Sequence, residues 1–233
     1  MSIRKKQELE QLISDVHLNN LNYHSREIYL HSFFHCDENN GETGVDYRMS
    51  VDFIKNLHVL SFQAALPIVV HMHSIGGSWN DGMAIFDSIR FSLCPVTILG
   101  YAQASSMTGV IIQAADKRVL SPNCEFMIHH GSLSVAESFP AVKAFVEMND
   151  KYCKRMLQIF ARRATKSSKY FKDKKFTEEK TYNFISKKLN EKTDWYMDAE
   201  EAVFYGFADG ILGTKGFESA ERLRCETKFK GIL

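Results

Sequence analysis

The sequence predicts an α/β protein built on a mostly parallel sheet. Short runs of β-branched and apolar residues alternate along the chain with segments whose apolar residues recur at helical spacing. Strands that alternate with helices favour parallel pairing, because each helix carries the chain back to the edge where the strand began. The 233 residues contain no linker-like stretch, and 45% are hydrophobic, which is enough to bury a sizeable core.

The N-terminal elements follow from local periodicity. Residues 1–16 mix charged side chains with spaced leucine, isoleucine and valine, which predicts a short amphipathic helix. Residues 27–35 predict a strand, and the polar, glycine-containing residues 36–46 predict a loop. Helical spacing then predicts a helix with one face formed by Val51, Ile54, Leu57 and Leu60.

The central elements alternate strand with helix. Residues 66–72 are a β-rich run that ends before Gly76-Gly77, and residues 95–100 are a second buried strand. Residues 105–115 predict a helix directly after that second strand. The helix between the two strands is expected to have one face formed by Met83, Phe86, Ile89 and Leu93.

The next part of the chain predicts one long helix. Short strands at residues 118–120 and 126–128 precede it. Pro140 fits the first turn of the helix, where a missing N–H costs nothing, and the helix reaches about Thr165. One face of this helix carries Phe145, Tyr152, Met156 and Phe160.

Residues 166–193 differ from the rest of the chain in their high charge. They have a patchy helical period and no clear strand, which indicates a charged surface insertion. After them, Asp198 and Glu201 have the spacing of an N-terminal capping pair. A last helix is therefore expected to begin there and to end at Gly206.

Composition argues against several functions. The 29 basic and 28 acidic residues give a net charge of +1, which offers no electrostatic basis for binding nucleic acid or an anionic membrane. The five cysteines are widely spaced without a Cys-x-x-Cys pair, which argues against a disulfide framework or zinc site and fits a reducing compartment. The charged N-terminus is unlike a secretory signal, and no apolar run approaches the ~18 residues that span a bilayer. We expect a soluble, cytoplasmic protein.

Two glycines and two serines are the first candidate site residues. Gly76 and Gly77 lie between a strand and a helix, where their N–H groups could bind a negative oxygen, although such turns are often purely structural. Ser105 and Ser106 lead from the next strand into a helix. A serine at that position is a nucleophile only if a base removes its proton, and otherwise it caps the helix.

Histidine and aspartate candidates follow later in the chain. His129 comes at the end of a predicted strand and could act as a general base, and Asp194 could orient such a base. Alternatively, His71, His73, His129 and His130 could form a metal site, but no carboxylate or cysteine completes a recognisable ligand spacing. None of these features decides the function by itself.

Taken together and in order, these segments resemble the proteolytic subunit of the Clp protease, the ClpP family. The similarity covers roughly residues 27–212, and five ordered segments are far more specific than a single serine motif. The matching segments are His73-Ser-Ile-Gly-Gly77, Ala102-Gln-Ala-Ser-Ser-Met-Thr108, Lys117-Arg118 with Leu120-Ser-Pro-Asn123, Ile128-His-His-Gly131, and Asp194-Trp-Tyr-Met-Asp-Ala-Glu-Glu-Ala-Val-Phe-Tyr-Gly-Phe-Ala-Asp209.

The resemblance implies a role for each matching site residue. Ser106, which precedes the methionine, corresponds to the family's nucleophile, His129 to its general base, and Asp194 to the acid that orients the base. The N–H groups of Gly77 and Met107 correspond to the oxyanion donors. The implied reaction is peptide-bond hydrolysis through an acyl-enzyme, without a metal or cofactor in this chain.

The resemblance also implies a fold and an assembly. ClpP proteins have a crotonase-like α/β core, here residues 27–212, with a long handle helix that would begin near Pro140. They stack as two rings, usually heptamers, and a separate AAA+ unfoldase that uses ATP feeds them polypeptide substrates. Homo-oligomeric rings and an unfoldase partner are therefore expected here. Residues 1–26 would form an N-terminal helical extension and residues 213–233 a C-terminal tail.

Several residues depart from the family pattern. Ile75 replaces a proline, Ser105 an alanine and Thr108 a glycine, and the interval of 65 residues from His129 to Asp194 is longer than expected. These departures indicate a divergent branch, of a kind familiar in bacteriophage genomes. Three alternatives to a Clp-type peptidase fed by an unfoldase stay open: a capsid-maturation protease, an inactive scaffold subunit, and a crotonase-type enzyme that acts on an acyl-CoA.

Overall fold

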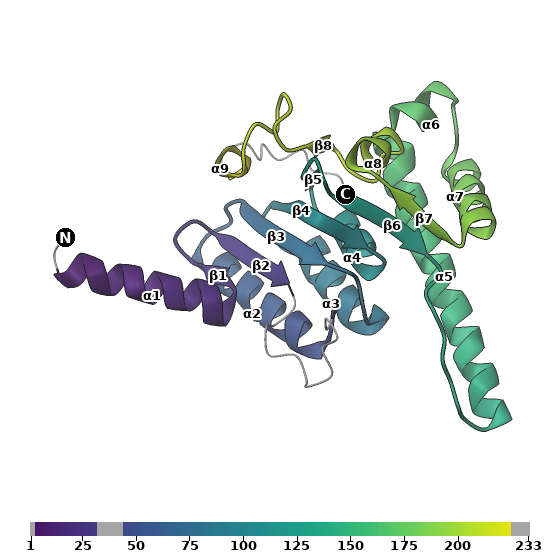
Figure 1. The fold of residues 1–233 in the computed structure, drawn as a ribbon, viewed down its shortest axis with the longest axis horizontal. Helices are drawn as coiled ribbons and strands as arrows, with labels where there is room; N and C mark the ends of the chain where they lie inside the picture. The colour runs from purple at the N-terminus through teal and green to yellow at the C-terminus, as the bar shows by residue number, and fades with distance from the viewer. Residues whose placement is uncertain (1–2, 32–43, 225–233) are drawn as a thin grey trace.

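An eight-stranded, mostly parallel sheet lies at the centre of the structure, a computed structural model that describes residues 3–31 and 44–224 (Figure 1). Among the described strands, the pairs β1–β2 and β6–β7 are antiparallel and the other pairs are parallel, so the predicted α/β class is confirmed. The spatial order is β1 (Leu21–Asn22), β2 (Glu27–His31), β3 (Ile68–Ser74), β4 (Val96–Ser105), β5 (Lys117–Leu120) and β8 (Gly210–Ile211), with β6 (Glu125–His129) beside β4 and β7 (Asp194–Met197) beside β6.

The central strand β3 is covered on both faces. Ile68, Val69 and Val70 are each at most 1% exposed. Such continuous β-branched runs are typical of parallel strands that are buried on both sides. The predicted strand is thus confirmed, with its bounds moved two residues toward the C-terminus. β4 also exceeds its predicted length and reaches Ser105.

Helices α2 (Tyr47–Gln63), α3 (Trp79–Arg90) and α4 (Met107–Ile111), with the 3-10 turn η1 (Ile112–Ala114), pack with the sheet into the main core. In α2, Leu57 and Leu60 are buried as predicted, but Phe53 takes the inner position expected for Ile54, which is half-buried. The correct face is therefore rotated by about one residue.

The predicted inner face of α3 is only partly right. Met83 and Ile89 are buried, whereas Leu93 is 80% exposed and lies beyond the end of the helix at Arg90. The chain leaves the helix before Pro95, because a proline disfavours the helical conformation in the residue before it. The prediction for Leu93 was therefore wrong.

The long helix α5 (Phe139–Ser167) is confirmed and has two unlike halves. The C-terminal half packs against the core through Met156 and Phe160, as predicted. The N-terminal half projects from the body of the molecule (Figure 1). Phe145, which was predicted to lie on the same inner face, is 47% exposed for that reason.

The charged residues 166–193 form two helices, α6 (Lys169–Asp173) and α7 (Glu178–Lys192), in place of the expected patchy surface segment. α7 packs along α5 and buries Thr181, Ile185 and Leu189, which recur every four residues. An aromatic cluster joins these helices to the end of the sheet: Tyr170, Phe171, Phe176, Phe184, Trp195 and Tyr205.

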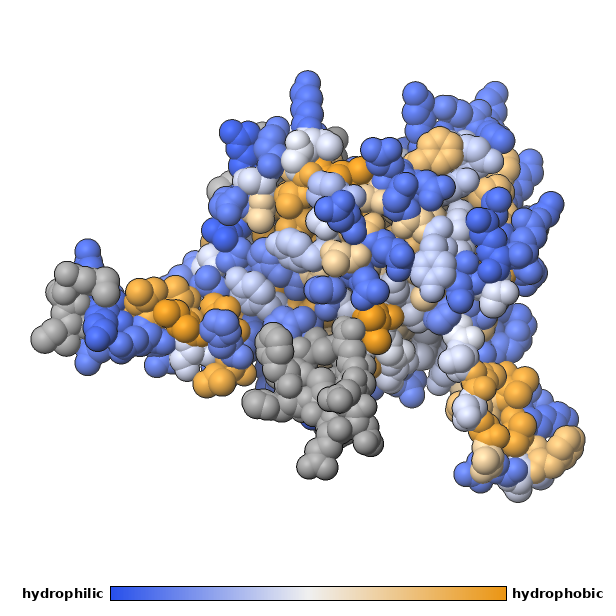
Figure 2. All heavy atoms as spheres, viewed as in Figure 1, coloured by the Kyte–Doolittle hydropathy of each residue, from blue (hydrophilic) through white to orange (hydrophobic). Residues whose placement is uncertain are grey.

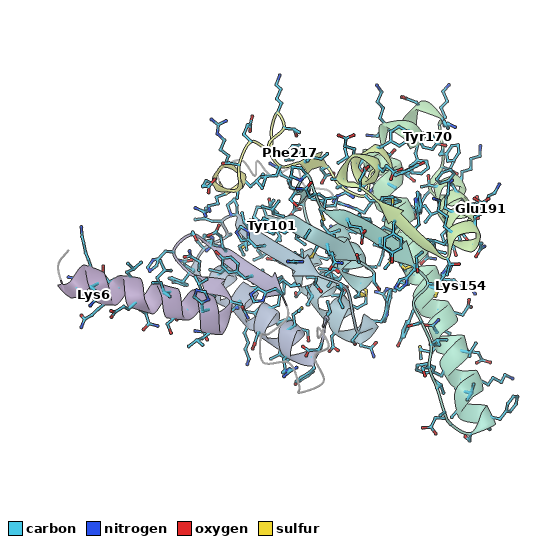
Figure 3. All side chains as sticks on the ribbon, viewed as in Figure 1. Lys6, Tyr101, Lys154, Tyr170, Glu191 and Phe217 are labelled. Carbon is cyan, nitrogen blue, oxygen red and sulfur yellow. The ribbon has the colours of Figure 1, made fainter. Side chains whose placement is uncertain are left out.

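The C-terminal part of the described chain contributes to both faces of the sheet: Ala199 and Ala202 belong to the main core, whereas Leu223 belongs to a separate cluster. The capped helix α8 (Ala199–Phe204) is confirmed, since the Glu201 N–H donates to Asp198 Oδ1 at 2.7 Å. Farther on, Leu223 in α9 (Ala220–Leu223) packs in a second apolar cluster that also holds Tyr101 and Phe217. Figure 3 shows Tyr101 on the sheet and Phe217 on the chain above it.

The N-terminal helix α1 (Ile3–Asn19) is confirmed and is longer than predicted. It projects from the body of the molecule, and Leu18 on it is 72% exposed (Figures 1 and 2). No helix in the described ranges combines the length and apolar character needed to cross a bilayer. Residues 32–43, which include most of the predicted loop, lie outside the described residues.

Candidate active site

Ser106 occupies a sharp turn between β4 and α4. Its backbone dihedrals, φ 55° and ψ −123°, place it in a region that residues other than glycine rarely adopt. The Ser106 N–H donates to Met127 O at 2.9 Å, which fixes the turn against β6. Ser106 is the N-cap residue of α4, but its side chain makes no capping hydrogen bond to the helix. Strain of about 1–3 kcal/mol at such a residue is typical of functional positions.

His129 connects Ser106 to Asp194. Its Nε2 lies 2.7 Å from Ser106 Oγ, and its Nδ1 lies 3.1 Å from Asp194 Oδ1. An ionised carboxylate can only accept, so Nδ1 carries the proton that bonds Asp194, and Nε2 is left to accept from the serine hydroxyl. The geometry therefore presents Ser106 Oγ to a basic nitrogen.

Strand pairing brings His129 and Asp194 together although they are 65 positions apart in the sequence. β6 and β7 are antiparallel, and the two residues are directly opposite each other at the end of the ladder. Neighbouring side chains on one face of such a pair lie within contact distance. The helices α5, α6 and α7 that fill the interval leave this register intact, so the longer interval does not separate the two side chains.

The glycine turn after β3 lies directly against Ser106. Gly76 has φ +104°, and a Cβ there would come within 2.6 Å of Ser106 Cβ and 2.9 Å of Met107 N. Both the positive φ and the close contacts require glycine, because a residue with a Cβ would clash with Ser106 and would be strained in this backbone conformation. Thr108 Oγ1 lies 2.8 Å from Ser74 O and so ties the turn to the start of α4.

Two backbone N–H groups next to Ser106 have no acceptor among the described residues. The Met107 N–H belongs to the first residue of α4, where no intrahelical partner exists. Gly77 lies opposite Val45 in an isolated bridge: the Val45 N–H donates to Gly76 O, and the Ser78 N–H donates to Val45 O. The N–H of Gly77 itself makes neither of these hydrogen bonds. Both donors are therefore free for an oxygen bound beside Ser106.

A hollow of about 410 Å³ lies over Ser106 and His129. Trp79 and Tyr152 form part of its wall, with their rings stacked 5.2 Å apart. Cys153 also lines it, but burial, with a smaller effect of Asp150, raises the pKa of its thiol. A raised thiol pKa leaves little thiolate, so Cys153 does not compete with Ser106 as a nucleophile.

The other candidates have different surroundings: His130 lines the hollow over Ser106, whereas Ser105 and His71 lie outside it. Ser105 is 4% exposed, and its Oγ has no partner among the described residues. His71 bonds Glu27 and Tyr101, and His129 bonds Ser106 and Asp194, so these two histidines do not converge on a shared centre. Within the described residues, no group of three or more potential ligands gathers to hold a metal ion.

Sequence reasoning missed two kinds of site residue. Trp79 was not singled out, although its position two residues after the glycine turn was an available signal. Tyr152 was assigned only to an inner helix face, and nothing in the periodicity of α5 distinguishes a residue that lines a cleft from one that fills the core. Thr108 was noted only as a departure, yet it holds the turn in place.

A serine on a strand-to-helix turn, a histidine in hydrogen-bond contact and an aspartate behind it are the arrangement typical of serine hydrolases on α/β folds. The family model for Clp protease matches residues 42–215. The ATP-dependent Clp protease proteolytic subunit 2 of Pseudomonas aeruginosa is 30% identical over 171 residues, which are 72% of this chain and 77% of that protein. The chain belongs to the Clp protease family.

Further comparisons agree with this assignment. The ATP-dependent Clp protease proteolytic subunit of Deinococcus radiodurans is 28% identical over 173 residues, which cover 73% of this chain and 77% of that protein. The solved structure of a point mutant of ClpP1 from Listeria monocytogenes matches with a TM-score of 0.64 at 21% identity, covering 84% of this chain and 96% of that one. The expected ClpP fold is therefore confirmed.

Proposed function

We propose that this chain is an active serine endopeptidase that cleaves unfolded polypeptides inside a ring assembly. The observation that carries the proposal is the continuous chain of contacts from Asp194 through His129 to Ser106, at 3.1 and 2.7 Å. The two free N–H groups of Gly77 and Met107 support it, because the serine alone would not stabilise the negative charge that develops on the substrate oxygen.

The mechanism follows from the roles that these positions allow. His129 Nε2 takes the proton of Ser106 as Oγ attacks the peptide carbonyl carbon, and the Gly77 and Met107 N–H groups bind the resulting oxyanion. His129 then gives the proton to the leaving amine, and the acyl-enzyme forms. A water activated by the same histidine releases the acid product and restores Ser106. Asp194 holds the imidazole in the required tautomer and stabilises its charged form.

The projecting half of α5 supports the proposal of an oligomer. Phe139 is 82% exposed, Val146 52% and Phe145 47%. Figure 2 shows hydrophobic side chains gathered over this end of the molecule. Contiguous exposed apolar surface on a soluble domain is typical of a contact between chains. Two stacked homo-oligomeric rings, a cytoplasmic location and a AAA+ unfoldase that consumes ATP complete the proposal. The names of the relatives support the dependence on ATP, because they describe the proteolytic subunit of an ATP-dependent protease.

Labelling with a fluorophosphonate probe tests the proposed nucleophile. The assembled wild-type protein is expected to react at Ser106, so Ser106→Ala should lose labelling and cleavage of small fluorogenic peptides. Ser105→Ala is the matched control, because this neighbour is buried and lies outside the contact chain. A folded, assembled wild-type protein that takes up no probe would overturn the proposal and favour the scaffold subunit.

A further inference from the structure

A second hollow, of about 570 Å³, lies between α3, η1 and the C-terminal half of α5. It shares no lining residue with the hollow over Ser106. Its lining carries no acidic side chain and is dominated by five cations: Arg90, Arg155, Arg162, Arg163 and Lys166. A volume in this range is typical of sites for small molecules.

The positive charges of this hollow are largely uncompensated. Arg162 forms an ion pair with Glu178 at 3.6 Å. The other four cations form no ion pair within the described part of the chain. In contrast, the buried guanidinium of Arg118, which is 1% exposed, is paired with a carboxylate. Its Nε and Nη2 bond the two carboxylate oxygens of Asp209. Arg90, Arg155, Arg162 and Lys166 are exposed to solvent, whereas Arg163 is half-buried, so the hollow presents a local concentration of positive charge that favours an anionic ligand.

Arg163 is the most enclosed of these cations. Its Nη2 donates to Ala115 O at 2.8 Å, but its Nε is buried and has no acceptor among the described residues. Burial, followed by repulsion from Arg118, lowers the pKa of this guanidinium to about 10 despite the attraction of Asp209.

The nature of the lining selects the ligand. Arginine presents planar pairs of donors that match phosphate oxygens, and four unpaired charges exceed what a single monoanion would neutralise. Phe86 and Ile159 supply an apolar part of the wall. We propose that this hollow binds a small molecule that carries two or more phosphate groups. The site is independent of the proposed peptidase function.

Titration calorimetry with inorganic tripolyphosphate, at fixed ionic strength, tests the proposal. The double variant Arg155→Gln/Arg162→Gln removes two exposed cations of the hollow, and Lys151→Gln/Lys154→Gln removes two exposed cations of the same helix that do not line it. Both variants lose two positive charges. We expect saturable binding by the wild-type protein, affinity at least about tenfold weaker in the arginine variant, and unchanged affinity in the lysine variant.

Three results would overturn this inference. The first is an absence of saturable tripolyphosphate binding by the assembled wild-type protein. The second is an equal loss of affinity in both double variants, which would indicate non-specific attraction. The third is orthophosphate binding as tightly as tripolyphosphate, which would leave the multivalent charge without a role. If the arginine variant loses assembly while the wild-type protein binds no tripolyphosphate, the hollow is a contact between copies of the chain.

Discussion

Two series of hydrogen-bonded side chains, each made of a carboxylate, an imidazole and a hydroxyl, lie along the same sheet and have different surroundings. We call them the first and the second chain. In the first, Asp194 contacts His129 at 3.1 Å and His129 contacts Ser106 at 2.7 Å. In the second, Glu27 contacts His71 at 3.0 Å and His71 contacts Tyr101 at 2.9 Å. The order of groups is the same, so the hydrogen-bond pattern alone does not distinguish a catalytic site from a structural one.

Burial and charge compensation distinguish them. The Asp194 side chain is 43% exposed and that of Glu27 only 2%. Burial raises the pKa of Glu27, but hydrogen bonds from His71, Ser25 and Arg224 outweigh it and lower the pKa to about 2. The Glu27 charge is thus held by several donors at once. Among the residues that the structure describes, the Asp194 carboxylate has one hydrogen-bond partner, the histidine, which leaves its effect concentrated on that base.

The hydroxyl groups differ as well. Ser106 lies on a strained turn beside free N–H donors and opens to a hollow. Tyr101 lies under the C-terminal segment, in the cluster that holds Leu223, and burial raises the pKa of its phenol. A phenol that resists ionisation and has no oxyanion donors serves packing and hydrogen bonding. The comparison supports the catalytic role that we propose for the first chain and indicates a stabilising role for the second.

The largest expected effect comes from Asp194→Asn. The amide cannot stabilise the charged imidazole and favours the wrong tautomer, so kcat for a fluorogenic peptide should fall by about 10⁴-fold. Stability should change by less than about 0.5 kcal/mol, because the side chain is partly exposed and makes one hydrogen bond within the described part of the chain. Peptide turnover and urea unfolding measure the two quantities. A rate loss of less than tenfold would contradict the role assigned to Asp194.

Replacing the carboxylate of the second chain by an amide should lower stability and leave the catalytic rate unchanged. Glu27→Gln removes the charge that Arg224 and His71 share, and we expect a loss of about 2–3 kcal/mol in the free energy of unfolding. The rate per folded molecule should not change. Glu221→Gln, an exposed carboxylate near the C-terminal end of the described chain, is the matched control and should cost less than about 0.5 kcal/mol.

Acid should reproduce that loss in the wild-type protein. The folded pKa of Glu27 is about 2, below its ordinary value of 4.5, so its contribution is fully present above about pH 5 and is lost as the pH falls toward 2. The stability difference between wild type and Glu27→Gln should therefore shrink over that range. Asp209, whose pKa is also lowered through Arg118, is common to both proteins and cancels in the comparison. A difference that stays constant from pH 7 to pH 2 would exclude the ionised Glu27 as its source.

The two chains also differ in how far the sequence predicts them. Ser106 and His129 are in local segments that carry their own signals, a strand-to-helix turn and a strand end. Contact between His129 and Asp194 depends on the register of β6 and β7, which composition and spacing do not reveal. The Glu27 chain had no signal at all, because its partner Arg224 is 197 residues away.

The fold shows the same difference: elements that depend on residues close in sequence were predictable, and elements that depend on distant partners were not. Apolar runs identified β3, β4 and α5, whose burial depends mostly on residues close in sequence. α7 was missed because its buried stripe includes the polar Thr181, which Thr165 satisfies from another helix at 2.9 Å. Tertiary partners decide such elements, and periodicity alone underestimates them.

The smallest expected effect separates the two hydroxyl groups. Tyr101→Phe deletes the partner of His71 Nδ1 while keeping the ring in its cluster, so the cost should be about 1 kcal/mol of unfolding free energy, with peptide cleavage unchanged. Tyr29→Phe is the matched control: this ring also stacks on His71, at 4.9 Å, but its hydroxyl has no hydrogen bond within the described residues. It should cost less than about 0.5 kcal/mol. Equal losses in the two variants would show that ring packing, rather than the hydroxyl of Tyr101, holds His71 in place, and the second chain would then end at the histidine.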